Sequence, residues 1–243
     1  MRPLHIVMPM AGEGSRFLKE GWTTPKPLIM LNGKTLFEHA ISSIAAPDIE
    51  LKYSFIVRQE HIDQYRIDKQ IRAILPKANV FSVLKTTRGA VETCLVAESA
   101  LADEDGVIVM DCDLEFRSKA FLEILTENLS LPLSEAEGGA LVSFESNEPR
   151  YSYAEVGTDG FVKRTAEKEV ISCHALCGAY FFSTGKKFKQ IAHRLLGEPE
   201  FKKPEYYVSL LYNYLLEDGE KVQLATMEEY YSYGTPEELT KYL

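Results

Sequence analysis

Residues 4–17 read LHIVMPMAGEGSRF, an apolar run followed directly by a glycine-rich turn. The run from Leu4 to Met10 has the length of a β-strand, and the glycines mark its end. Successive backbone N–H groups in such a turn form a concave anion site, and glycine lets a phosphate approach without a Cβ in the way. Since ligands of open α/β sheets gather outside the carboxyl ends of the strands, this turn is a candidate phosphate site.

The turn lacks the marks of two common phosphate motifs. Phe17 stands where a dinucleotide-binding fingerprint has its third glycine, and no Gly-Lys-Ser/Thr follows. The next segment strengthens the prediction, because two prolines flank Lys26 and stiffen the loop that presents its ammonium group. Arg16 and Lys26 supply two cations, which suits the charge that spreads over phosphoryl oxygens during transfer. The alternative is a solvent-exposed lysine in a turn.

Downstream of the turn, apolar runs alternate with helical patterns. The predicted strands are 4–10, 53–57, 80–84 and 107–110, and the predicted helices between them are 35–46, 62–75 and 90–101. This alternation is typical of βαβ units with a mostly parallel sheet. After residue 128 the pattern changes to strands 140–144, 153–157, 161–164, 179–182 and 222–225 and helices 186–196, 206–216 and 236–243. We therefore expect one doubly wound α/β domain over 1–243, with a core half at 1–128 and a smaller α+β extension at 129–243.

The composition limits the classes of partner. With 243 residues, 45% of them hydrophobic, the chain can bury one compact core. Its net charge of −9 repels a nucleic-acid backbone, so we expect no nucleic acid as a partner. No stretch reaches the roughly 18 apolar residues of a membrane span, and the N-terminus lacks the apolar region of a signal peptide. Four cysteines fit reduced thiols, so a cytoplasmic protein without a membrane partner is expected.

A pair of acids follows the predicted strand 107–110. Asp111 and Asp113 are expected at the carboxyl edge of the sheet, near the glycine turn. A bend just after Asp111 would let both carboxylates reach one Mg²⁺, which binds through one or two carboxylates together with phosphate oxygens and waters. The alternative is two solvated acids that cap the next helix.

The paired segments GEGSRF (12–17) and TPKPLI (24–29) resemble the signature of the sugar-phosphate nucleotidyltransferase family. That family includes hexose-1-phosphate thymidylyl-, uridylyl- and cytidylyltransferases and phosphocholine cytidylyltransferases, and the short chain resembles capsule-type members. The resemblance implies a Rossmann-like, GT-A-like sheet with a nucleotide-binding half at 1–128 and an acceptor-binding half at 129–243. It implies that Arg16 and Lys26 grip the triphosphate and stabilise the pentavalent transition state. The residues implied to line the nucleotide are Met10, Ala11, Gly12 and Gly14.

Further matches extend the resemblance over most of the chain. The segment 87–90 resembles the loop that reads the base, so Thr87, Gly89 and Ala90 are implied to bind the nucleotide. The pair at 167–168 is similar to an E-K pair in which Glu167 takes an acceptor hydroxyl or amine and Lys168 takes the acceptor phosphate. The segment 178–182 resembles the floor of the acceptor pocket, with Gly178 and Tyr180 as binding residues. The segment 234–237 is similar to a closing G-T-P-E.

The metal site departs from the family pattern. The resemblance assigns Asp111 to the metal, whereas thymidylyltransferase-like members have a second acid where this chain has Ser232. Asp113 is the candidate replacement, and the number of metal ions stays open.

The resulting functional hypothesis is an in-line displacement. An acceptor phosphate attacks the α-phosphorus of an NTP, CTP or UTP being favoured, and pyrophosphate leaves with the help of Mg²⁺. Hexose phosphates, phosphocholine-like and phospho-amino-acid-like acceptors stay open, as does a homo-oligomer. One alternative is a metal-dependent glycosyltransferase that uses the Asp-x-Asp pair to bind a nucleotide-sugar. This alternative gives no function to the glycine turn or to Lys26. Another is a non-catalytic nucleotide-binding protein.

Overall fold

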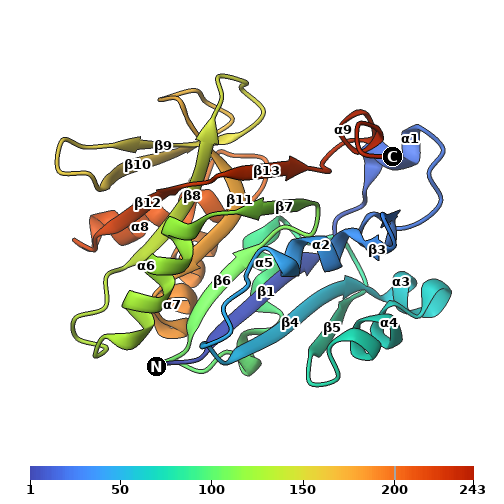
Figure 1. Cartoon of the computed structure of the whole chain (residues 1–243), viewed down its shortest axis with the longest axis horizontal. Coiled ribbons are helices and arrows are strands. Elements are labelled where there is room, and N and C mark those ends of the chain that lie inside the picture. Colours follow the sequence, from blue (N-terminus) through green and yellow to red (C-terminus); the bar gives the residue numbers. More distant parts are fainter. Residues whose placement is uncertain (200) are drawn as a thin grey trace.

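A mixed β-sheet forms the centre of the computed structural model, which describes residues 1–199 and 201–243 (Figure 1). The strands run in the order β10-β9-β11-β6-β1-β4-β5, and β8 pairs with both β11 and β12. The strands of this sheet are β1 (Leu4–Met10), β4 (Leu51–Arg58), β5 (Asn79–Val83), β6 (Gly106–Met110), β8 (Gly139–Glu145), β9 (Ser152–Val156), β10 (Val162–Glu167), β11 (His174–Phe182) and β12 (Val222–Thr226).

The N-terminal half of the sheet is parallel, as the sequence predicts. β1 lies between β4 and β6, and β5 extends the sheet beyond β4. The side chains of β1 are buried on both faces: Ile6 and Met8 pack in one apolar cluster, and Val7 packs in another. Burial on both faces explains why this strand is a continuous apolar run rather than an alternating one. The glycine turn therefore emerges at the carboxyl edge of a rigid strand.

The C-terminal half joins the sheet in antiparallel fashion. β11 pairs with β6, β8 and β9, and the hairpin β9–β10 forms the far edge. Only β12 runs parallel to its neighbour β8 in this half, within the described residues. The mostly parallel core with an α+β extension is thus confirmed.

Helices cover both faces of the sheet. They are α1 (Ser15–Lys19), α2 (Leu36–Ser42), α3 (Gln59–Tyr65), α4 (Ile67–Ile74), α5 (Ala90–Leu95), α6 (Lys119–Ser130), α7 (Gly185–Leu196), α8 (Leu211–Glu217) and α9 (Pro236–Thr240), with 3₁₀ turns η1 (Lys26–Leu28), η2 (Glu98–Ala100) and η3 (Val208–Leu210). Helices α2, α4 and α6 share one buried cluster, and α5, α7 and α8 share the other. No helix in the described chain is long and apolar enough to cross a membrane.

Several predicted helices differ from the observed ones. The helix expected over 62–75 is two helices, because Arg66 adopts a left-handed φ of 54° between α3 and α4. The helix expected over 90–101 ends at Leu95 and continues only as η2. The helix expected over 206–216 starts as η3 at Val208 before α8.

Two short antiparallel pairs were not predicted. β2 (Met30–Leu31) pairs with β3 (Lys34–Thr35), and β7 (Leu114–Arg117) pairs with β13 (Glu229–Ser232). The second pair carries the C-terminal segment back to the centre of the molecule, where the Tyr233 amide donates to the Asp113 carbonyl at 2.8 Å. α9 then packs near α1, since Leu239 and Phe17 share an apolar cluster (Figure 1).

Candidate active site

The glycine turn leaves β1 through a left-handed residue, Gly14, and keeps open space beside Gly12. Gly14 has a φ of +63°, in the left-handed region, and its carbonyl accepts the first hydrogen bonds of α1 from Phe17 and Leu18. A Cβ at Gly12 would meet no described atom within 4 Å, so the space beside Gly12 is open. The turn therefore presents accessible backbone at the carboxyl end of the central strand.

A first cavity, of about 270 Å³, lies against this turn and is called the loop cavity here. It is lined by Pro9, Met10, Gly12, Gly14, Lys26, Pro27, Asp111, Cys112 and Asp113. The structure thus brings the predicted nucleotide-lining residues Met10, Gly12 and Gly14 together with Lys26 and the acid pair. Ala11 is buried beneath the turn and does not line the cavity.

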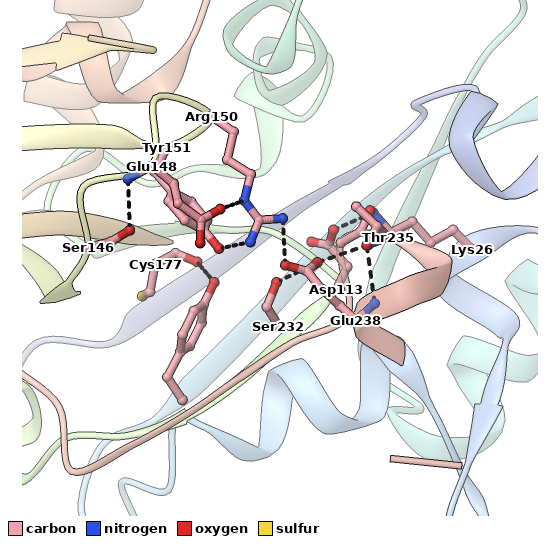
Figure 2. A network of polar contacts seen from close by, with 12 residues as sticks. Lys26, Asp113, Ser146, Glu148, Arg150, Tyr151, Cys177, Ser232, Thr235 and Glu238 are labelled. Atoms are coloured by element: carbon pink, nitrogen blue, oxygen red, sulfur yellow. Dashed lines mark hydrogen bonds and ion pairs between the residues drawn. The ribbon is translucent and has the colours of Figure 1, made fainter. Parts of the chain in front are cut away.

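Lys26 is fixed at the point where three segments meet. Its ammonium group donates to the Asp113 carboxylate and, at 3.3 Å, to the carbonyl of Gly234 (Figure 2). Burial is the largest single influence and lowers the pKa of Lys26, but the charges of Asp113, Cys112 and Asp111 and the hydrogen bond to Asp113 together raise it above its ordinary value. The ammonium group of Lys26 is therefore fixed by its partners, and Lys26 is not the solvent-exposed turn lysine of the alternative interpretation.

The acid pair occupies a bend after β6, as the two-carboxylate hypothesis requires. The chain bends at Cys112 and Asp113, and the Asp111 amide donates to the Gly178 carbonyl at 2.9 Å. A Cβ at Gly178 would lie 2.6 Å from Asp111 Oδ2, so glycine makes room for this carboxylate. Burial, then the charges of Asp113 and Glu167, raises the pKa of Asp111 to about 7, against the opposing effect of Lys26.

The donor set fits a metal ion that arrives with phosphate. Within the described residues, no cluster of three or more His, Cys, Asp or Glu side chains could hold a metal by itself. Asp111 and Asp113 offer carboxylate oxygens, although one Asp113 oxygen is paired with Lys26. Magnesium needs only one or two carboxylates when phosphate oxygens and waters complete its shell. Crowded carboxylates that resist ionisation are also what a divalent cation would relieve.

A second cavity, of about 320 Å³, adjoins the first and shares Asp111 and Asp113 with it; it is called the central cavity here. Its lining contains many predicted site residues, namely Arg16, Ala90, Asp111, Asp113, Glu167, Gly178 and Tyr180. It also contains residues that the sequence did not single out, including Arg150, Tyr151, Ser152, Glu205, Tyr207, Tyr230 and Glu238. The two cavities therefore meet at the acid pair, with the glycine turn on one side and the C-terminal half on the other.

Glu167 is fixed at the wall of the central cavity. Its Oε2 accepts hydrogen bonds from the hydroxyl of Ser152 and, at 2.9 Å, from the hydroxyl of Ser209. Both hydroxyls donate to the same carboxylate oxygen. Among the described contacts, the other oxygen, Oε1, therefore has no partner and can accept a hydrogen bond from a ligand. This position agrees with the predicted role of Glu167 toward an acceptor hydroxyl or amine, which stays a prediction.

Lys168 is placed differently from its predicted role. It has a positive φ of 57°, its side chain is exposed, and Nζ donates to the Tyr207 hydroxyl at 2.8 Å. Tyr207 lines the central cavity, but Lys168 does not. Glu167 is the buried last residue of β10, whereas Lys168 follows the strand with a left-handed backbone and an exposed side chain, so only Glu167 lines the central cavity.

The predicted base loop is closed by a segment of the C-terminal half. Thr87 Oγ1 donates to the Gly89 carbonyl at 3.1 Å and lies 2.5 Å from Thr93 Oγ1. The Tyr206 amide donates to the carbonyl of Arg88, so residue 206 lies directly over Gly89. Thr87 and Gly89 line neither the loop cavity nor the central cavity, and their role toward a base stays a prediction.

We expect Gly89→Ala to lower the free energy of unfolding by about 2–4 kcal/mol, because it combines a strained φ with a backbone clash. Gly89 has a φ of +144°, and a Cβ would lie 2.4 Å from the Tyr206 nitrogen. Gly160→Ala is the matched control: its φ of +82° is also unfavourable, but a Cβ there meets open space. Urea unfolding of both variants separates the clash from the strain. Equal losses would show that the contact with Tyr206 contributes nothing.

Arg150 and Glu238 are the functional candidates that sequence reasoning missed. Arg150 Nη1 lies 2.7 Å from Glu238 Oε1, and Glu238 Oε2 accepts from the Ser232 hydroxyl at 3.0 Å (Figure 2). Glu238 also completes the capping box of α9 with Thr235. The capping-box spacing could have identified Glu238 as a helix-start residue. No local signal identifies Arg150, because its partner lies in a distant segment.

The known proteins that this chain resembles are nucleotidyltransferases and a nucleotide-sugar pyrophosphorylase. A family model described as the MobA-like NTP transferase domain matches residues 6–199. A 2-C-methyl-D-erythritol 4-phosphate cytidylyltransferase from Chromobacterium violaceum is 35% identical over 137 residues, which span 56% of this chain and 56% of that relative. The match therefore covers little more than half the length of the curated relative.

Solved structures match almost the whole chain. The nucleoside-diphosphate-sugar pyrophosphorylase from Vibrio cholerae RC9 superposes with a TM-score of 0.84 at 28% identity, over 98% of this chain and 99% of that one. A candidate glucose-1-phosphate thymidylyltransferase from Bacillus anthracis gives a TM-score of 0.75 at 18% identity, over 98% and 93%. The second likeness concerns the fold alone.

Proposed function

Since the chain belongs to the MobA-like NTP transferase domain family, we propose that it transfers a nucleotidyl group from CTP or UTP to the phosphate of a small ester and releases pyrophosphate. The observation that carries the proposal is the meeting of two cavities at Asp111 and Asp113, beside the ion-paired Lys26. One cavity carries the glycine turn for a triphosphate, and the other offers room for a second substrate. The name of the cytidylyltransferase relative supports CTP as the first candidate.

The reaction needs no nucleophile from the protein. An oxygen of the acceptor phosphate, already an anion, attacks the α-phosphorus of the NTP and forms the new P–O bond. The bond from the α-phosphorus to the bridging oxygen breaks on the opposite side, and pyrophosphate leaves with that oxygen. Backbone N–H groups of the glycine turn and the guanidinium of Arg16 hold the triphosphate, and Lys26 stabilises the charge on the transferred group.

Magnesium is the cofactor that we propose, with Asp111 and Asp113 as its protein ligands. When bound, the ion neutralises phosphate charge at the reacting centre and favours departure of pyrophosphate. The chain's own contribution is to hold both carboxylates at one bend after β6 and to keep Lys26 beside them. The raised pKa of Asp111 agrees with a carboxylate whose counter-ion is brought by the substrate.

The acceptor that we propose is polar and carries a hydroxyl or amine. Glu167 presents a carboxylate oxygen to the central cavity, and Glu205 adds a second acid to its lining. Sugar phosphates, phosphocholine-like esters and phospho-amino-acid-like esters all satisfy this chemistry. Similarity to a nucleoside-diphosphate-sugar pyrophosphorylase supports a sugar phosphate as the acceptor. We further propose that the product is made in the cytoplasm and serves capsule or surface polysaccharide synthesis.

A pyrophosphate-release screen tests the proposal. Each of the four NTPs is offered with glucose 1-phosphate, phosphocholine, O-phosphoserine or 2-C-methyl-D-erythritol 4-phosphate, with magnesium or with EDTA. We expect release with CTP or UTP, in magnesium, and only when a phosphate ester is present. Glucose, choline and serine are the matched acceptors without phosphate and should give none.

Other outcomes of the screen identify the rivals. A further arm offers a nucleotide-sugar in place of the NTP; its hydrolysis or transfer, with no pyrophosphate from any NTP, would indicate the glycosyltransferase. Tight NTP binding without turnover for any acceptor would indicate a nucleotide-binding protein. Pyrophosphate release that ignores the acceptor would indicate an NTP hydrolase and would contradict the proposed transfer.

A further inference from the structure

The acceptor side of the central cavity needs a cation, because the proposed acceptor carries a phosphate into an acidic lining. Asp111, Glu167 and Glu205 all contribute carboxyl groups to that lining. Arg16 and Arg150 are the only cationic side chains in the lining as far as the structure describes the chain. Arg16 follows the glycine turn on α1, and the proposed reaction uses it to hold the triphosphate. Arg150, at the entrance to β9, belongs to the acceptor side.

Arg150 is held in place by neighbours that leave part of its guanidinium group free. Nε pairs with Glu148 Oε2 at 2.7 Å, Nη1 pairs with Glu238 Oε1 at 2.7 Å, and Nη2 donates to the Tyr151 hydroxyl at 2.5 Å. An arginine has five N–H donors, so among the described residues these contacts leave one donor on each terminal nitrogen. A phosphate oxygen can accept a charge-assisted hydrogen bond from such a donor.

The ring of Tyr151 adds rigidity to this arrangement. The Arg150 guanidinium carbon lies 4.6 Å from the ring centroid, so the plane of the group is supported from one side. Tyr151 itself is held because its carbonyl accepts the Lys168 amide at 3.0 Å. Glu148 is 57% exposed, so water screens its charge more than that of the nearly buried Glu238. The side chain is thus oriented before any ligand arrives.

The Arg150 network leads directly to the reacting centre. Glu238, Ser232 and Asp113 all face Gly234: a Cβ at that glycine would lie 3.1, 3.6 and 3.5 Å from their respective side-chain oxygens. Lys26 reaches the same point from the other side through Asp113 and the Gly234 carbonyl. Figure 2 shows Arg150 and Lys26 on opposite sides of this group of oxygens. An anion in the central cavity can therefore be held by Arg150 close to the acid pair.

We propose that Arg150 binds the phosphate of the acceptor, the role that the sequence assigned to Lys168. The inference rests on the proposed nucleotidyl transfer and adds a binding residue to it. Lys168 is exposed, donates to the Tyr207 hydroxyl and does not itself line the cavity, whereas Arg150 lies in the lining and keeps N–H donors that no described residue takes. Ser232 takes part indirectly, because its hydroxyl orients the Glu238 carboxylate that holds Arg150.

The test is a comparison of KM values in the arginine variants. The acceptor is whichever of the four phosphate esters in the screen gives the highest rate. We expect Arg150→Met to raise the acceptor KM by about 10- to 100-fold, the effect of losing charge-assisted hydrogen bonds, with the NTP KM changed by less than about twofold. Arg150→Lys keeps the charge but not the planar fork and should lie between. Arg164→Met is the matched control, since Arg164 forms a surface pair with Glu155 at 2.5 Å on β10.

A binding measurement separates phosphate recognition from a local disturbance of the loop. By calorimetry, Arg150→Met should weaken the phosphate ester while its counterpart without phosphate binds as it does to the wild type. The inference is overturned if the acceptor KM of Arg150→Met stays within about twofold of wild type while Lys168→Met raises it about tenfold or more. If the wild type is active in the same assay, such a result refutes the role of Arg150 but leaves the proposed function intact. The proposed function itself is refuted only if the wild type releases no pyrophosphate.

Discussion

Lys26→Ala is expected to lower kcat/KM for nucleotidyl transfer by about 10²- to 10⁴-fold, the range found when a charge that stabilises the transferred phosphoryl group is removed. The reason is position: the ammonium group is held against Asp113 and the Gly234 carbonyl, where the two cavities meet. The pKa of Lys26 is raised by Asp113, so the cation persists throughout the working pH range. Steady-state pyrophosphate release measures the effect.

Structural damage has to be separated from lost catalysis in this variant, because Lys26 also forms an ion pair. Lys26→Met keeps most of the aliphatic stem and removes only the charge, and it should lose activity to a similar extent. Lys34→Ala, at an exposed lysine of β3, is the matched control and should retain the wild-type rate. If Lys26→Ala unfolds earlier than wild type but keeps its kcat/KM, Lys26 is a structural residue and the assignment is wrong.

Asp111→Asn is expected to reduce kcat/KM by about 10³-fold or more while making the metal-free protein more stable. The amide can no longer serve as an anionic ligand, so magnesium-dependent turnover should be lost. Stability moves the other way, because burial and the neighbouring Asp113 raise the pKa of Asp111 to about 7 from an ordinary value of 3.8. A carboxylate that resists ionisation costs folding energy at neutral pH, and asparagine removes that cost.

The pH dependence follows from the direction of that pKa shift. The pKa of Asp111 is higher in the folded protein than in the unfolded chain. Its contribution to the free energy of unfolding is therefore fully present below about pH 4 and is lost as the pH rises through about 7. The variant should therefore gain on wild type as the pH rises, reaching about 1–3 kcal/mol at about pH 8. Urea unfolding in EDTA at about pH 5 and about pH 8 measures this difference. A variant that is less stable than wild type at both pH values would contradict the account.

The parallel core could be predicted because its strands are continuous apolar runs. β1 and β6 are buried on both faces, and burial of that kind leaves a strong pattern in the sequence. The short strands β7 and β13 could not be predicted, since a few alternating residues look the same in a loop. Likewise, nothing in the sequence around Arg66 predicts that this residue adopts a left-handed conformation and divides one helical pattern into two helices.

The candidate site divides in the same way. Gly12, Gly14 and Lys26 are close together in sequence, and the bend after Asp111 follows from the end of a strand, so local reasoning found them. Arg150 depends on Glu238, which reaches it only because the β7–β13 pair returns the C-terminal segment to the centre. Contacts of this kind depend on how the strands are connected in space, and the spacing of motifs along the sequence does not predict that arrangement.

Phosphorus NMR of a completed reaction distinguishes nucleotidyl transfer from hydrolysis of the nucleotide. The protein is incubated with CTP or UTP, magnesium and the best phosphate ester of the screen. Nucleotidyl transfer predicts equal amounts of inorganic pyrophosphate and of a diphosphate-linked product in which the ester phosphorus has moved from a monoester to a diphosphate signal. Nucleoside monophosphate and pyrophosphate beside an unchanged phosphate ester would contradict it, because the chain would then hydrolyse the nucleotide rather than transfer it.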